Sequence, residues 1–205
     1  SLEPMDCTPE IIDLVTTSPR FAAHFHLPLQ HASDTVLRRM RRPYTRREYE
    51  QVVGRIRQNA PDAAIGSDVV VGFPGETDAH ATENIRFLTQ SPLTYLHVFP
   101  YSDRPGTEAS KMKGKVHGQT IRDRARAVRE VGSVLSQQFR TAQIGRIRPG
   151  LTLRQRARTV VLTDNYLRVQ VPVPPPENVR VHVRILTATD SPAGELVNES
   201  MTSTP

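Results

Sequence analysis

Three short polar segments, each following an apolar stretch typical of a strand, hold most of the residues that could do chemistry. Positions 72–77 read Gly-Phe-Pro-Gly-Glu-Thr and follow three valines. The glycines allow backbone to approach a ligand closely, and the start of the next helix favours anionic or polar groups. Positions 30–33 read Gln-His-Ala-Ser, and positions 101–107 read Tyr-Ser-Asp-Arg-Pro-Gly-Thr. Because ligands bind at the carboxyl ends of parallel strands, we expect one composite binding rim, although an ordinary Pro-Gly turn also explains the first segment.

Six of the ten residues at positions 38–47 are arginine, with one tyrosine among them. Arginine binds phosphate in a bidentate way, and an aromatic ring can stack on a base, so the run suits nucleic acid. A solvated helix end is the alternative interpretation. The chain has 27 basic and 21 acidic residues, but the overall excess of arginine follows equally well from a GC-rich coding sequence.

The candidate metal ligands are few. His24 and His26 alternate and therefore share one face of a strand, but without a third ligand we expect buried, hydrogen-bonded histidines. Cys7 is the only cysteine among 205 residues, which excludes a disulfide framework and any cluster or zinc site built from several thiolates of this chain. We expect Cys7 to be a small buried residue or a reactive thiol without a partner, and we expect no metal ligands.

Alternating helices and strands are predicted over the first 143 residues. The expected strands span 21–29, 64–73 and 93–100. The expected helices span 9–15, 34–40 and 120–142, with two more after the Thr45–Glu48 capping box and after Asp78 as a cap. This order predicts a parallel sheet with right-handed crossovers. Three strands do not close a barrel, so we expect the later part of a larger α/β domain.

The pattern changes after Gly145. Short alternating segments at 151–153, 159–162, 167–173 and 179–186, with a turn at Asp164-Asn165, predict a small antiparallel β-barrel or sandwich. Residues 144–205 hold eight arginines and five acids, so positive charge is more than twice as dense there as in the preceding part. We place the domain boundary so that residues 1–144 form one unit and residues 145–205 the other.

Taken together, these segments resemble the radical S-adenosylmethionine (SAM) methylthiotransferases. The similarity runs through positions 24–33, 40–49, 68–77, 97–107 and 162–169. It implies an α/β fold class, with the C-terminal part of a partial (β/α)6 radical SAM barrel that binds SAM. It also implies a small antiparallel β-barrel after it, TRAM-like, that binds RNA.

The resemblance also implies roles for individual residues. Glu3 would contact the SAM ribose, Gln30 and Ser33 would hold its amino-acid end, and the backbone of the 72–76 loop would border the adenine. The implied cofactor-binding residues are therefore Glu3, Gln30, Ser33, Gly72, Pro74, Gly75 and Glu76. The implied substrate-binding residues are Arg41, Arg42, Tyr44, Tyr101, Arg104, Arg156, Arg158 and Arg168.

Positions 40–45, 97–102 and 162–166 most resemble the branch that adds a methylthio group to C2 of N6-threonylcarbamoyladenosine beside the tRNA anticodon. The implied partner is the tRNA anticodon stem-loop. One departure points elsewhere: Gln-His-Ala-Ser at 30–33 replaces the usual Gln-Ser-Gly-Ser and resembles the branch that modifies an aspartate of a ribosomal protein. A catalytically inactive RNA-binding protein is the third possibility.

The family's Cys-x-x-x-Cys-x-x-Cys triad, which holds the SAM-cleaving cluster, is absent, as are three cysteines for an auxiliary cluster. We therefore expect a C-terminal fragment with no catalytic residue of its own, inactive alone. Its full-length enzyme would use SAM and two 4Fe-4S clusters, and the missing N-terminal part would be a partner. Without an apolar run of about 20 residues or a signal peptide, we expect a cytoplasmic protein and no membrane contact.

Overall fold

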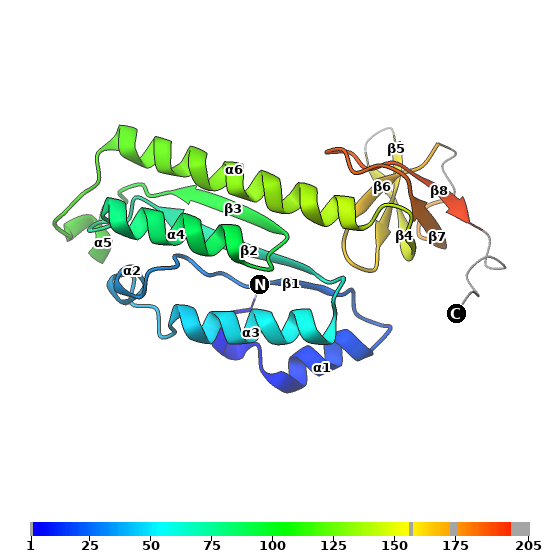
Figure 1. Ribbon diagram of the computed structural model, residues 1–205, viewed down its shortest axis with the longest axis horizontal. Coiled ribbons are helices and arrows are strands. Elements are labelled where there is room, and N and C mark those ends of the chain that lie inside the picture. Colours follow the sequence, from blue (N-terminus) through cyan, green and yellow to red (C-terminus); the bar gives the residue numbers. More distant parts are fainter. Residues whose placement is uncertain (1, 156–157, 173–175, 198–205) are drawn as a thin grey trace.

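The computed structural model describes residues 2–155, 158–172 and 176–197. Two sheets lie one after the other along the molecule, and the helix α6 (Gly118–Ala142) lies along the first sheet and ends at the second (Figure 1). In the described ranges no helix is both long enough and apolar enough to cross a membrane.

The first sheet is parallel, as the sequence predicted, with the order β1-β2-β3. Its strands are β1 (His24–His26), β2 (Ala64–Val71) and β3 (Tyr95–Pro100). Strand β1 is shorter than expected, because Pro28 has no N–H to continue the ladder beyond the bond from Leu27 to Gly66. The chain returns to the sheet edge at Gln30, which forms a parallel bridge with Val69.

The predicted helices are all present, with small differences at their ends. The Thr45–Glu48 capping box is confirmed at the start of α3. Asp78 was predicted to cap α4, but Thr77 is the cap: its hydroxyl accepts from the His80 N–H, while Asp78 is the first helical residue. A 3-10 turn and a one-turn helix after β3 were not anticipated. The remaining elements are η1 (Pro4–Asp6), α1 (Pro9–Thr17), α2 (Asp34–Arg39), α3 (Arg46–Asn59), α4 (Asp78–Gln90) and α5 (Glu108–Lys111).

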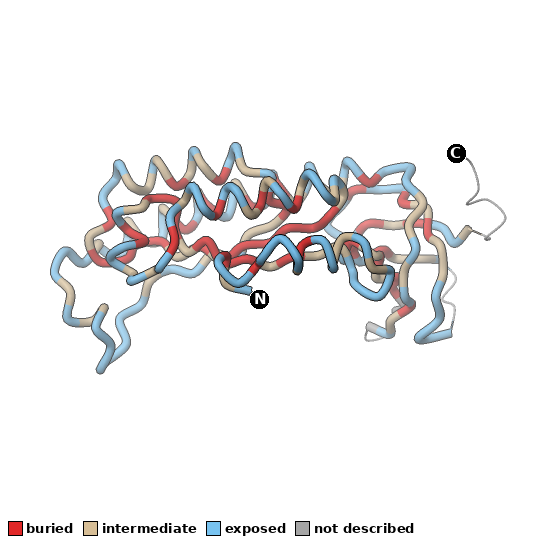
Figure 2. Tube along the Cα trace, turned by 90° about the horizontal axis from the view of Figure 1, so that it is seen from below, coloured by how far each residue is buried: buried red, intermediate tan, exposed pale blue. Residues whose placement is uncertain are grey.

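One face of the parallel sheet is covered by helices. Phe25, Ile65 and Val69 point to this side and join one core with apolar residues of α3, α4 and α6, so buried positions follow the strands through the middle of the molecule (Figure 2). Cys7 is buried beside this core, as predicted. The opposite face of the strands carries polar side chains, and the candidate site lies there.

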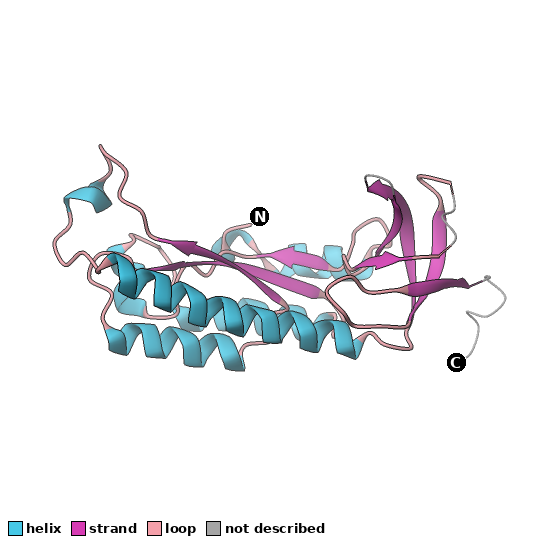
Figure 3. Ribbon diagram, turned by 90° about the horizontal axis from the view of Figure 1, so that it is seen from above, coloured by secondary structure: helices cyan, strands magenta, loops and turns pink. Residues whose placement is uncertain are grey.

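The second sheet is antiparallel, which confirms the predicted change of architecture after α6. Its strand order is β6-β5-β4-β7-β8. Figure 3 shows this sheet at the C-terminal end of the molecule. A bridge between Gln170 and Ala193 brings its two edges together at one end, so the sheet curls into a TRAM-like half-barrel. Strand β8 was not predicted, and β6 ends before Pro172. The strands are β4 (Ile147–Gln155), β5 (Arg158–Thr163), β6 (Arg168–Gln170), β7 (Arg180–Ile185) and β8 (Gly194–Val197).

The turn between β5 and β6 joins the half-barrel to the α/β part. Asn165 is fully buried there, and its side-chain amide donates to the Asp62 carbonyl at 3.1 Å and to Gln143 Oε1 at 3.0 Å. The Ala23 N–H donates to the Asp164 carbonyl at 2.7 Å, directly before β1. The turn predicted at Asp164-Asn165 therefore also lies at the contact between the two parts.

Candidate functional site

A cavity of about 450 Å³ opens at the carboxyl end of the parallel strands, on the face not covered by helices. We call it the rim pocket. Its volume lies in the range of small-ligand sites. Four residues predicted from the sequence line it: Gln30, Arg42, Tyr101 and Arg104. The other lining residues are Met40, Asp68, Val70, Phe73, Phe99, Pro100, Ser102, Thr107 and Ala109.

Gln30 is held at the pocket by an unusual backbone conformation. Its φ is 66°, in the left-handed region that residues other than glycine rarely adopt. Its N–H donates to the Asp68 carbonyl at 2.9 Å, and its own carbonyl accepts from the Val70 N–H at 2.8 Å. The strain is therefore stabilised by two bonds to β2, which fix Gln30 at the edge of the pocket.

The 72–77 loop is organised by Glu76, whose carboxylate points inward. The side chain is fully buried, accepts from the backbone N–H groups of Gly72 and Phe73, and pairs with Arg124 at 3.1 Å. Burial raises the pKa of Glu76, against the lowering effect of the Arg124 charge and the two N–H donors. Of this loop only Phe73 lines the pocket, so Gly72, Pro74, Gly75 and Glu76 lie behind it.

Two further predicted cofactor residues lie away from the pocket wall. Ser33 is buried at the N-cap of α2, where its N–H donates to His31 Nδ1 at 2.9 Å. Glu3 pairs with Arg42 at 3.1 Å, and its second carboxylate oxygen, Oε2, is buried without a hydrogen-bond partner. Through Arg42, Glu3 is connected to the pocket although it does not line it.

Two arginines of the arginine-rich run make contacts within the protein. Arg39 donates to the Pro74 carbonyl at 2.9 Å and supports the 72–77 loop, and Arg46 pairs with Glu83 at 3.2 Å. Tyr44 is 5% exposed, and its hydroxyl donates to the Pro28 carbonyl at 3.0 Å. The phenol ring is therefore packed in the core, where no base can stack on it. Arg41 is exposed, at a φ of 56°.

The predicted tail arginines belong to the half-barrel. Arg168 is exposed on β6. Arg158 begins β5, and Arg156 lies outside the described residues.

At the other end of the molecule the Tyr101 hydroxyl donates to Asp103 at 2.6 Å, and Lys115 pairs with the same carboxylate. The Tyr101 ring is thereby oriented at the pocket mouth, with Lys115 5.3 Å from its centroid.

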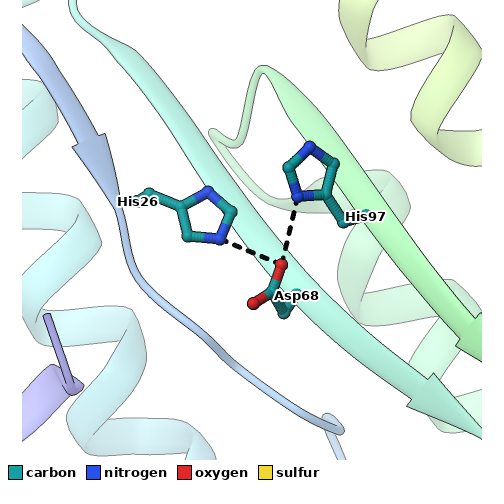
Figure 4. A group of neighbouring side chains, drawn as sticks. All are labelled: His26, Asp68 and His97. Carbon is teal, nitrogen blue, oxygen red and sulfur yellow. Dashed lines mark hydrogen bonds and ion pairs between the residues drawn. The ribbon is translucent and has the colours of Figure 1, made fainter. Parts of the chain in front are cut away.

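A second polar group, the histidine cluster of His26, Asp68 and His97, lies on the same face of the sheet (Figure 4). His26 Nε2 is 2.9 Å from Asp68 Oδ1, and His97 Nδ1 is 3.2 Å from the same oxygen. Each residue comes from a different strand, and Asp68 also lines the rim pocket. The cluster and the pocket are thus neighbouring parts of one surface.

Tyr95 extends this cluster toward the half-barrel. Its hydroxyl is 3.0 Å from His26 Nδ1 and 2.8 Å from His24 Nε2. Burial raises the pKa of Tyr95 to about 12 and, together with the His26 charge, lowers that of His24 to about 4. A Cβ at Gly66 would lie 1.9 Å from Tyr95 Cζ, so only glycine at this position lets the ring lie across β2.

The sequence prediction included His24 and His26 but not Asp68, Tyr95 or His97. Part of the signal was present, because polar side chains alternate in β1 and in the first half of β3, whereas β2 carries Asp68 next to Ser67 without alternation. Side chains two residues apart along a strand point to the same face of the sheet, and the parallel register of β2 and β3 pairs His97 with Asp68. The register could not be derived from the sequence alone, and it is what turns three separate strands into one cluster.

Residues 2–88 match the family model of the Radical SAM superfamily. The threonylcarbamoyladenosine tRNA methylthiotransferase of Aquifex aeolicus is 39% identical over 161 residues, covering 78% of this chain and 38% of that protein. The tRNA-2-methylthio-N(6)-dimethylallyladenosine synthase of Acidothermus cellulolyticus is 35% identical over 203 residues, which cover 98% of this chain and 39% of that protein. The ribosomal protein uS12 methylthiotransferase of Salinispora arenicola is 42% identical over 123 residues, covering 60% and 24%. The chain thus spans less than two fifths of the length of these relatives.

Proposed function

The chain belongs to the methylthiotransferase family of radical SAM proteins, and on that premise we propose that it forms the cofactor- and substrate-facing part of a tRNA-modifying enzyme. The proposed reaction adds a methylthio group to C2 of N6-threonylcarbamoyladenosine beside the anticodon. One observation carries the proposal: Gln30, expected at the cofactor, and Arg42, Tyr101 and Arg104, expected at the substrate, line the same pocket.

The rim pocket fits part of a SAM molecule. It offers a side-chain amide from Gln30, a carboxylate from Asp68 and apolar walls from Val70 and Phe99. These groups suit the ammonium and hydroxyl donors and the flat base of the cofactor. When bound beside a reduced cluster, SAM supplies the radical chemistry. The residues of this chain bind and orient it, and Glu3 holds Arg42 at the pocket edge.

The iron–sulfur clusters of the family do not fit this chain. A cluster takes three or four thiolates, and the only cysteine, Cys7, is buried beside the core, where burial raises its pKa and disfavours the thiolate. No step of the reaction is therefore assigned to a cluster held by these residues. The cluster-dependent part of the activity therefore requires cysteine ligands that this chain does not contain.

The substrate surface would combine phosphate contacts with stacking. Arg104 and Arg42 stand at the pocket, and the Tyr101 ring at its mouth is oriented by Asp103. Arg168 is exposed on the half-barrel. We propose that the pocket receives the modified adenosine, while Arg168, with Arg156 and Arg158, meets phosphates of the stem.

The branch that modifies N6-threonylcarbamoyladenosine is favoured over the ribosomal-protein branch by the location of the one discordant motif. The segment departs from Gln-Ser-Gly-Ser at His31 and Ala32, and both residues are fully buried and do not line the pocket. The Nδ1 of His31 accepts the Ser33 N–H, so the two departures affect loop packing and not a contact in the pocket. They therefore carry no weight for a protein substrate.

Binding to an anticodon stem-loop tests this proposal. We expect the purified chain to bind a stem-loop carrying N6-threonylcarbamoyladenosine at least tenfold more tightly than the same stem-loop with plain adenosine. Arg104→Ala should remove much of that difference. Arg20→Ala, which removes an exposed arginine outside the pocket, is the charge-matched control and should leave it unchanged. Equal affinity for the two stem-loops would contradict the assigned substrate.

A further inference from the structure

The histidine cluster has the composition of a metal site. It contains two imidazoles and one carboxylate from three adjacent strands, and the candidate ligand atoms all lie within 4.8 Å of one another. Imidazole and carboxylate together suit Zn²⁺ and neighbouring first-row divalent ions. The sequence predicted no metal ligand, since His24 and His26 had no third partner. In the folded chain Asp68 and His97 lie beside His26 and complete a set of three ligands. His24 is not part of this set but contacts it through Tyr95.

The spacing of the ligand atoms also fits one ion. Metal–nitrogen bonds of about 2.0–2.1 Å in a tetrahedral site set ligand atoms roughly 3.3 Å apart and two bound imidazole centroids about 5 Å apart. The Asp68 oxygen is 2.9 Å from His26 Nε2 and 3.2 Å from His97 Nδ1. The centroids of His26 and His97 are 5.1 Å apart. Small side-chain adjustments would therefore admit the ion.

The surroundings supply the support that metal-binding histidines need. A ligating imidazole usually donates its other N–H to a fixed acceptor, which sets the tautomer and the ring orientation. His26 Nδ1 already lies 3.0 Å from the Tyr95 hydroxyl, and that hydroxyl lies 2.8 Å from His24 Nε2. With the ion bound, His26 donates to Tyr95 and Tyr95 donates to His24. In the metal-free chain the same two hydrogen bonds form with donor and acceptor exchanged.

We propose that His26 Nε2, Asp68 and His97 Nδ1 bind a divalent transition-metal ion of the Zn²⁺ type, with Tyr95 as the positioning residue. Three protein ligands leave a fourth position open, as in zinc sites that bind water or substrate. Asp68 belongs to both the cluster and the rim pocket, so an oxygen ligand at the fourth position lies beside that pocket. The site is separate from the clusters of the family, because it contains no thiolate.

The alternative is a hydrogen-bond network without a metal. There the neutral His26 donates from Nε2 to Asp68, and Tyr95 donates to His26 Nδ1. Such a network needs the same residues for stability but does not bind ions with a fixed stoichiometry. Metal binding itself therefore separates the two possibilities.

The test is a titration of untagged, chelator-treated protein with Co²⁺, followed by displacement with Zn²⁺. We expect one ion per chain and the visible absorption of tetrahedral Co²⁺. Asp68→Asn and His97→Ala should each weaken binding at least tenfold, and Tyr95→Phe should weaken it about 10- to 100-fold. His97 is the most exposed of the three ligands, at 56%, so its variant is the least able to affect folding.

Two controls complete the experiment. His182→Ala removes a histidine from β7 in the half-barrel, and Cys7→Ser removes the only thiol. Both should bind the ion like the parent, with circular dichroism reporting that every variant is folded. Absence of stoichiometric binding in the parent, or undiminished binding in folded His97→Ala, would overturn the proposal.

Discussion

The imidazole ring of His24 lies flat against the phenol ring of Tyr166, with centroids 4.1 Å apart and planes 8° from parallel. His24 begins the first strand of the parallel sheet, and Tyr166 follows the buried Asn165 in the turn of the half-barrel. Through Tyr95, His24 is connected to the histidine cluster. One continuous set of side chains therefore leads from the half-barrel to the edge of the rim pocket.

Removing the Tyr166 ring should loosen the contact between the two parts. We expect Tyr166→Ala to lower the unfolding free energy by about 1 kcal/mol, the usual contribution of an aromatic pair beyond its buried area. Tyr166→Phe keeps the ring and serves as the matched control. Chemical denaturation measures both, and equal losses in the two variants would mean that the stacked ring contributes nothing.

Gly66 should be irreplaceable because of the Tyr95 ring that crosses it. We expect Gly66→Ala to destabilise the protein by about 1–3 kcal/mol, since the new methyl group forces the ring to move. Gly54 on α3 has no atom within 4 Å of an added Cβ, so Gly54→Ala is the control. It should be neutral or stabilising by up to about 1 kcal/mol. A folded Gly66→Ala protein of unchanged stability would contradict the described position of Tyr95.

Acid should destabilise the protein through His31. Burial lowers the pKa of His31 to about 3, whereas the unfolded chain protonates near the ordinary value of 6.5. Between these values the unfolded state binds more protons, so stability falls as the pH decreases from 6.5 toward 3. The loss is about 1.4 kcal/mol per pH unit. Glu76, with its raised pKa, acts in the opposite direction.

The comparison that isolates His31 is the pH dependence of His31→Gln. This variant lacks the titrating group, so its unfolding free energy should depend less steeply on pH between 6.5 and 4 than that of the parent. Urea denaturation at several pH values measures the difference. Parallel curves for parent and variant would show that His31 is not the acid-sensitive group.

The tail arginines should affect binding of all RNA sequences alike. We expect Arg168→Ala, combined with Arg156→Ala and Arg158→Ala, to weaken stem-loop binding and to reduce the dependence of log affinity on log salt by up to one unit per lost phosphate contact. Arg184 pairs with Glu195, which makes Arg184→Ala a control within the same sheet. Unchanged affinity in the triple variant would remove the half-barrel from the RNA surface.

The helices and the parallel strands could be predicted because local signals suffice for them. Thr45 with Glu48 marks a helix start, and three consecutive valines mark a buried strand. Strand β8 escaped prediction because its pairing partner, β7, determines it and its own four residues do not. In the site, Tyr44 was assigned to substrate from its arginine neighbours, although its ring fills the core. Burial depends on long-range packing, which a local pattern does not contain.

The central claim is best tested by expressing this chain as part of a methylthiotransferase that supplies the cysteine ligands of the clusters, in a bacterium lacking its own methylthiotransferases, followed by mass spectrometry of tRNA nucleosides. We predict 2-methylthio-N6-threonylcarbamoyladenosine in the tRNA, with the amount reduced at least tenfold by Arg104→Ala and unchanged by Arg20→Ala. A methylthio group found only on N6-dimethylallyladenosine, or only on ribosomal protein uS12, would contradict the proposed substrate.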